Sequence, residues 1–271
     1  MKESFTLRFL YKTLPGRIVL KLLIQPKVSK ITAKYLSSGA SKWLVPYYIR
    51  KHHVNMRGIE IPENGFSSFN AFFTRKKKAG RQELTSTSLI SPCDGFLTCI
   101  KIKNNLIFNI KHTKFSLEDL LKDKRLASKF YDGTALIFRL TPANYHRYCY
   151  VADGRVLRTR TIPGKLHCVR PIALGEFPVF AQNSREYQII KTQSFGTMVQ
   201  MEIGALLVGK INNHHQETGC VLAGREKGTF EFGGSTIILL FTKNAACFRK
   251  ELFQNKNRNE ELSIHMGDFL T

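Results

Sequence analysis

Beyond residue 86 the apolar residues come in short runs bounded by turns, and this pattern constrains the fold more than any other feature. The runs occupy residues 96–102, 106–110, 134–140, 197–203, 205–211 and 236–242, and Gly, Asn, Asp and Pro turns separate them. Short apolar runs between such turns are typical of β-strands. Ser116 is expected to cap one short helix among them. We therefore predict a β-rich body over residues 86–271.

From Phe5 to about Tyr48 the chain follows a different pattern, in which apolar and basic residues alternate, much of it at helical spacing. Pro15, Pro26 and Pro46 divide this stretch into short helices, and Glu3 is the only acidic residue before Arg57. Basic amphipathic helices suit an anionic lipid surface, although a helical cap packed on the body would show the same pattern. A polar linker over 79–88 separates the two parts. The prediction is an α+β fold with a basic helical region, 1–85, and a β-rich catalytic domain, 86–271.

The net charge of +22, from 42 Lys and Arg against 20 Asp and Glu, indicates an anionic partner. No nucleic-acid-binding module is recognisable in the sequence. We therefore favour an anionic membrane surface over nucleic acid as the partner. The six scattered cysteines form no CxxC pair and no ligand cluster with histidine, which predicts no metal site, no disulfide framework and a reducing compartment. No apolar stretch approaches the roughly 20 residues that span a bilayer. We predict a peripheral membrane protein on the cytoplasmic face.

Three separated motifs carry side chains suited to catalysis. Asp94 lies in the turn Ser91-Pro92-Cys93-Asp94-Gly95, His146 follows a predicted strand, and Ser235 lies in Gly233-Gly234-Ser235-Thr236 before an apolar run. A carboxylate, an imidazole and a hydroxyl are the parts of an activated serine. The Gly234–Ser235 bond suits self-cleavage because glycine leaves the carbonyl open. The same sequence is also typical of a glycine bulge before a buried strand.

In this order, these motifs resemble those of the phosphatidylserine decarboxylase family. The matching segments are Phe69-Asn70-Ala71-Phe72-Phe73-Thr74-Arg75, the Asp94 turn, Tyr145-His146-Arg147, Ile162-Pro163-Gly164-Lys165-Leu166, 180–186, Val208-Gly209-Lys210-Ile211 and 232–236. The resemblance implies a proenzyme that cleaves between Gly234 and Ser235 into a β chain, 1–234, and an α chain, 235–271, which stay associated. It also implies a pyruvoyl cofactor made from Ser235. That group would form a Schiff base with phosphatidylserine, releasing CO₂ and phosphatidylethanolamine.

The resemblance further implies roles for the other two side chains. His146 transfers a proton during decarboxylation, and Asp94 orients and charge-stabilises the base of self-cleavage. Many members of the family have a second histidine at the position of Cys149, which normally partners the aspartate and the serine. Three replacements are open, namely a Cys149 thiolate with a lowered pKa, His146 acting in both steps, or His167. We favour His146.

Other basic residues and other functions stay open at this point. His214 and His215 are expected in a surface loop, either as ordinary polar residues or with a substrate-binding or proton-transfer role. Arg147 and Lys210 are candidates to face the lipid phosphate or carboxylate. The alternative functions are a pyruvoyl decarboxylase for another amine substrate and a non-catalytic protein that binds anionic lipid. Homo-oligomerisation is compatible with the sequence.

Overall fold

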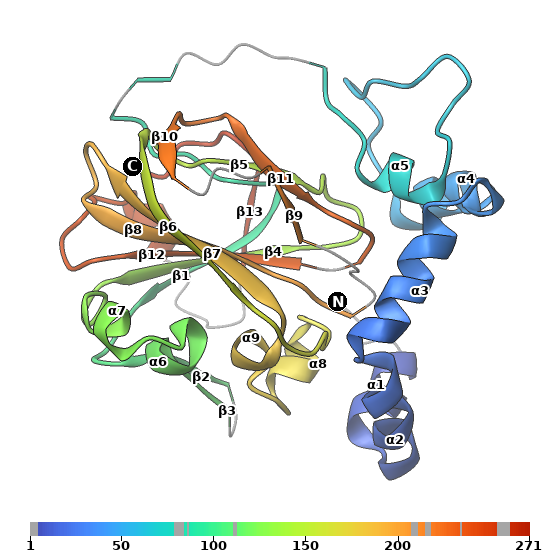
Figure 1. The fold of residues 1–271 in the computed structure, drawn as a ribbon, viewed down its shortest axis with the longest axis horizontal. Coiled ribbons are helices and arrows are strands. Elements are labelled where there is room, and N and C mark those ends of the chain that lie inside the picture. The colour runs from blue at the N-terminus through green and yellow to red at the C-terminus, as the bar shows by residue number, and fades with distance from the viewer. Residues whose placement is uncertain are drawn as a thin grey trace.

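A computed structural model describes residues 5–78, 84–85, 87–110, 113–206, 211–214, 218–233, 235–253 and 261–271. It contains a large antiparallel sheet, two smaller sheets and short helices (Figure 1), which confirms the predicted α+β class and its β-rich body. The boundary after residue 85 stays a prediction.

The large sheet has eight strands in the order β10-β6-β7-β8-β12-β4-β1-β13, and all neighbouring strands are antiparallel. Its strands are β1 (Gly95–Lys101), β4 (Thr134–Leu140), β6 (Gly154–Ile162), β7 (Arg185–Thr192), β8 (Thr197–Ile203), β10 (Gly219–Val221), β12 (Ser235–Phe241) and β13 (Leu262–Ile264). Strand β12 is central and buried along its whole length, as expected for a continuous apolar run. The first residue of this central strand is Ser235.

The two faces of the large sheet are covered differently (Figure 1). A three-stranded sheet, β5-β11-β9, lies over one face, and short helices lie over the other. These elements are β5 (Arg147–Cys149), β9 (Ile211–Asn213), β11 (Glu226–Phe230), α6 (Leu117–Leu121), α7 (Lys124–Ser128), α8 (Pro171–Leu174) and α9 (Val179–Gln182); β2 (Leu106–Ile110) pairs with β3 (Thr113–Ser116), and a 3-10 turn spans Lys250–Phe253. Hydrogen bonds from two consecutive residues of β7 confirm the layers. Arg185 Nε donates to Leu120 O of α6 on one face, and Glu186 accepts from Asn213 Nδ2 of β9 on the other.

The predicted strands agree with the observed ones to within one residue at five of the six runs. The run 205–211 is wrong at its start, since β8 ends at Ile203 and β9 begins only at Ile211. Gly204 leaves the ladder because its N–H donates to Ser184 O and its carbonyl accepts from Asn183 Nδ2. The predicted cap is confirmed, since Ser116 Oγ accepts from the N–H of Asp119.

The N-terminal region forms a row of helices along one side of the body, blue in Figure 1. These are α1 (Phe5–Lys12), α2 (Leu14–Leu23), α3 (Pro26–Leu36), a 3-10 turn (Gly39–Ser41), α4 (Leu44–His52) and α5 (Phe69–Phe73). Pro15 and Pro26 lie in the first turns of α2 and α3, where the missing N–H costs nothing. None of the described helices is long and apolar enough to cross a membrane.

These helices bury only part of their apolar surface. Tyr11 and Leu20 join the main core, and a second cluster forms around Tyr48, Phe69, Phe72 and Phe73. Many other large apolar side chains point outward, with exposures of 86% for Phe5, 78% for Leu14, 66% for Ile18, 66% for Leu22, 72% for Ile31 and 64% for Trp43. The region thus both packs on the body and presents an apolar surface.

Candidate active site

Ser235 begins the central strand β12, where it is paired with Leu140 of β4. Its side chain is fully buried, and its Oγ has no hydrogen-bond partner among the described residues. Gly233 takes a positive φ of 142°, a conformation that favours glycine. Gly234 lies outside the described residues. A buried hydroxyl without a partner costs free energy, which makes Ser235 a candidate for chemistry rather than for packing.

His146 lies between β4 and β5 and is fully buried. Its Nδ1 is 2.9 Å from the carbonyl oxygen of Asn144, and its ring centroid is 4.0 Å from that of Phe73. Its Nε2 has no hydrogen-bond partner among the described residues, and the backbone of Gly233 lies close enough to favour the protonated ring and raise its pKa slightly. Burial and then the charge of Arg75 lower the pKa of His146 to about 3. The imidazole is therefore neutral near pH 7. With Nδ1–H donating to the carbonyl of Asn144, Nε2 carries a lone pair. The Gly233 backbone near the ring comes two residues before Ser235 in the sequence.

Arg75 is a site residue that sequence reasoning did not single out. Only 4% of it is exposed, and its Nε has no hydrogen-bond partner among the described residues. Its Nη2 donates to Asn144 O at 3.4 Å, the carbonyl that also contacts His146. Phe73 and Arg75 both come from the segment 69–75, so the matched N-terminal motif supplies the surroundings of the imidazole. The match of this segment to the family was the feature of the sequence that could have identified Arg75.

Asp94 lies just before β1, at the same end of the sheet as Ser235. The register shows this, because Arg139 of β4 is opposite both Phe96 and Thr236. The Asp94 carboxylate accepts from Lys77 Nζ at 2.9 and 3.1 Å and from the N–H of Met266 at 2.9 Å. No contact joins it to His146 in the described part of the chain.

Cys149 and His167 have environments that bear on the missing histidine. Burial raises the pKa of the Cys149 thiol to about 12, the reverse of what a thiolate base needs. The His167 ring packs 4.7 Å from that of Phe177 and 6.2 Å from that of Tyr11. Burial lowers its pKa to about 4, with a smaller contribution from Lys165. The described ring contacts of His167 are thus with Tyr11 of the helical region and Phe177 of the body, and not with the Ser235 motif.

The remaining predicted candidates are engaged elsewhere or not described. Arg147 donates to Glu226 at 2.7 Å and to the carbonyl of Thr74, and His214 Nε2 is 2.7 Å from the same Glu226 carboxylate. His215 and Lys210 lie outside the described residues.

A buried polar cluster between the large and the three-stranded sheets was also missed. Lys227 and Glu202 form an ion pair with neither side chain exposed. Asn213 donates to Glu202 and Glu186, and its own side-chain oxygen accepts from Tyr148. The available signal was Gln200 and Glu202, two polar residues at alternate positions of an apolar strand. Within the described residues no cluster of His, Cys, Asp and Glu is arranged to hold a metal ion.

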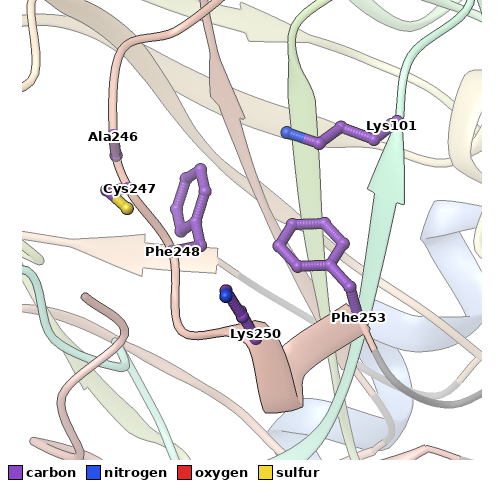
Figure 2. A pocket seen from close by; sticks show the side chains of 6 residues that line it. All are labelled: Lys101, Ala246, Cys247, Phe248, Lys250 and Phe253. Carbon is purple, nitrogen blue, oxygen red and sulfur yellow. The ribbon is translucent and has the colours of Figure 1, made fainter.

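A surface pocket lies at the opposite end of the sheet (Figure 2). Its lining is Lys101, Ala246, Cys247, Phe248, Lys250 and Phe253. Lys101 is opposite Thr134, which is opposite Phe241 at the far end of β12 from Ser235. At about 3.4 Å per residue, the strand places these ends roughly 20 Å apart. The pocket is therefore separate from the Ser235 site.

Comparison with known proteins gives a consistent result. Residues 69–270 match the family model described as phosphatidylserine decarboxylase. The chain is 39% identical over 265 residues to phosphatidylserine decarboxylase proenzyme 2 of Clostridium acetobutylicum, covering 97% of this chain and 90% of the relative. It is 36% identical over 267 residues to the phosphatidylserine decarboxylase proenzymes of Fusobacterium nucleatum and Ruminiclostridium cellulolyticum, in each case covering 97% of this chain and 89% of the relative.

Proposed function

The chain belongs to the phosphatidylserine decarboxylase family, and we propose that it cuts its own backbone between Gly234 and Ser235 to make its cofactor. It is a carboxy-lyase that converts phosphatidylserine to phosphatidylethanolamine and CO₂. We assign residues 1–234 to the β chain and 235–271 to the α chain, which remain associated.

The observation that carries this proposal is the buried, unpartnered Oγ of Ser235 at the start of β12. A pyruvoyl group at this position fits the site, because the hydroxyl that would be consumed makes no hydrogen bond to the described residues. Such a group supplies a ketone that takes up the amine of the substrate and withdraws electrons as CO₂ leaves. The strand pairing of Ser235 holds the reacting position in place.

We assign His146 to proton transfer at the substrate carbon. Its Nδ1 contact with Asn144 fixes the orientation of the ring, and Phe73 covers one ring face and excludes water. The low pKa leaves Nε2 unprotonated near pH 7, so His146 would first accept a proton and then pass it to the substrate carbon. We assign Asp94 to positioning the base of self-cleavage. Its carboxylate binds Lys77, which precedes the body, and the N–H of Met266, which follows β12, and it lies at the end of the sheet that carries Ser235.

We further propose that the helical region docks on an anionic membrane surface at the cytoplasmic face. Leu14, Ile18 and Leu22 of α2 are exposed, and the same helix carries Arg17 and Lys21. Apolar side chains enter the interface while basic side chains contact head groups. This surface favours a lipid substrate over a water-soluble amine.

Intact-mass measurement on the purified wild-type chain and a Ser235→Ala variant tests the self-cleavage. The wild type should give two fragments, with the C-terminal one beginning at residue 235 and lighter than a free serine terminus by the elements of ammonia. Ser235→Ala should remain one chain without decarboxylase activity, whereas Ser263→Ala, an exposed serine of the same fragment, should be cut normally.

A folded wild-type chain that stays intact would overturn the proposed processing and favour a non-catalytic lipid-binding protein. If cleavage occurs, assays with phosphatidylserine and with free amines then separate the lipid substrate from other amine substrates.

A further inference from the structure

The carboxylate of Glu202 has one oxygen bound and one oxygen open. Its Oε2 pairs with Lys227 Nζ and accepts from Asn213 Nδ2 at 3.2 Å. Its Oε1 has no hydrogen-bond partner among the described residues, although the side chain is fully buried. A buried carboxylate oxygen without a partner is costly. This open oxygen needs an explanation beyond folding.

The strand register directs Glu202 toward Ser235. Glu202 of β8 is opposite Ile237 of β12, so both side chains point to the same face of the sheet. Ser235, two residues before Ile237, also points to that face. Residues in this diagonal relation lie roughly 7–8 Å apart, within reach of a long side chain. The two unpartnered oxygens, Glu202 Oε1 and Ser235 Oγ, therefore share one buried layer between the sheets.

A β-bulge brings the lysine into the same layer. Glu226 is opposite Cys149 and Gly228 is opposite Tyr148, which leaves Lys227 as the extra residue. A bulge re-aims the side chain that it carries, and Lys227 Nζ lies 5.9 Å from the centre of the Tyr148 ring, against Glu202. A fully buried ion pair adds little net stability, because desolvation offsets the attraction. Folding alone gives no reason for this pair.

Resting on the self-cleavage proposed above, we propose that Glu202 is the base that accepts the Ser235 hydroxyl proton, the role left open by Cys149. As the proton moves from Oγ to Glu202 Oε1, Oγ bonds to the Gly234 carbonyl carbon. The bond from that carbon to the Ser235 nitrogen then breaks, and the nitrogen takes the proton back from Glu202. The product is an ester between Gly234 and Ser235 Oγ. Lys227 is a positioning residue, which acts by holding Oε2.

Electrostatics supports this assignment. Burial raises the pKa of Glu202 above that of an ordinary carboxyl, and Lys227 opposes the rise. A carboxylate with a raised pKa is a better proton acceptor, provided that it stays ionised. The titratable groups facing Glu202 are Lys227 of β11, Glu186 of β7, Tyr148 of β5, Tyr150 just after it and Cys93 before β1.

The test is the rate of self-cleavage of the full chain, followed on denaturing gels after synthesis in a cell-free system. Glu202→Gln keeps the shape of the side chain but removes the base, so cleavage should slow by about 100-fold or more. Glu186→Gln is the matched control, because Glu186 is buried in the same cluster but both of its oxygens accept hydrogen bonds, from Asn213 and Thr161. It should cleave at close to the wild-type rate. A folded Glu202→Gln chain that cleaves at the wild-type rate would overturn the proposal.

A second variant decides the matter if Glu202→Gln fails to fold. Lys227→Met removes the charge that lowers the pKa of Glu202, so the rising limb of the cleavage rate should move to higher pH. A purely structural role predicts a slower rate at every pH with an unmoved limb, and that result would overturn the proposal. Failure of the wild type to cleave at all would instead count against the self-cleavage itself.

Discussion

The helical region and the interior between the sheets depart from ordinary packing in opposite directions. On α1 to α4, large apolar side chains face outward, with Phe5 86% exposed and Ile31 72% exposed. Between the sheets, charged side chains such as Glu202 and Lys227 are completely buried. Each arrangement is unfavourable for an isolated soluble chain. On the proposals above, this difference reflects where each region would function, one against a lipid surface and one in a reaction that needs a dry interior.

Replacing His146 is expected to give the largest effect on the interior side of this comparison. His146→Ala should still cleave itself if Glu202 is the base, but kcat for decarboxylation should fall by about 10²- to 10⁴-fold. The measurement is CO₂ release from phosphatidylserine in mixed micelles. His167→Gln is the control, because His167 is also a buried neutral histidine, and its kcat should be nearly unchanged. Full kcat in processed His146→Ala would remove His146 from the chemistry.

Exchanging apolar side chains on α2 tests the exterior side. The double variant Ile18→Gln/Leu22→Gln should bind anionic phospholipid vesicles at least about 100-fold more weakly, because each apolar side chain contributes roughly 1.5–3 kcal/mol when it leaves water. Self-cleavage should be unaffected. Vesicle sedimentation measures the binding. Leu157→Gln/Leu222→Gln, at two exposed sites of the body, serves as the control, and an equal loss there would deny α2 any special role.

His167 sharpens the comparison because it lies where the helical region meets the body. Its pKa is about 4 in the fold against 6.5 in the unfolded chain, so the unfolded state binds more protons between these values. The free energy of unfolding therefore falls as pH drops from 6.5 to 4, by at most about 1.4 kcal/mol per pH unit for this group. His167→Phe should reduce the fall in Tm by a few degrees. An unchanged acid dependence by calorimetry would show that His167 does not titrate as described.

The apolar runs predicted the central strands well, because a strand that is buried at every position, such as β4 or β12, consists mainly of apolar residues. The side of the sheet next to the edge strand β10 was harder, since β6 carries four basic or threonine side chains in Arg158-Thr159-Arg160-Thr161 and shows little apolar alternation. Strand β7 was missed because Arg185 and Glu186 are buried through side-chain hydrogen bonds rather than by being apolar. Such burial depends on partners that are distant in sequence.

The candidate site was predictable in its parts but not in its connections. Ser235, His146 and Asp94 were identified from motifs, and the structure places all three toward the same end of the sheet. That Asp94 contacts Lys77 instead of the imidazole depends on the path of the chain around the body. The inward direction of Lys227 depends on a bulge, which only the strand register reveals.

The position of β12 also bears on how the molecule would behave after the proposed cleavage. The new chain end would remain hydrogen-bonded between β4 and β8, while the same fragment contributes β13 at the edge beside β1. Dissociation would require withdrawal of a central strand and an edge strand together. A chain cut before Ser235 would therefore be held together by strand pairing, and its two parts are expected to stay together on dilution.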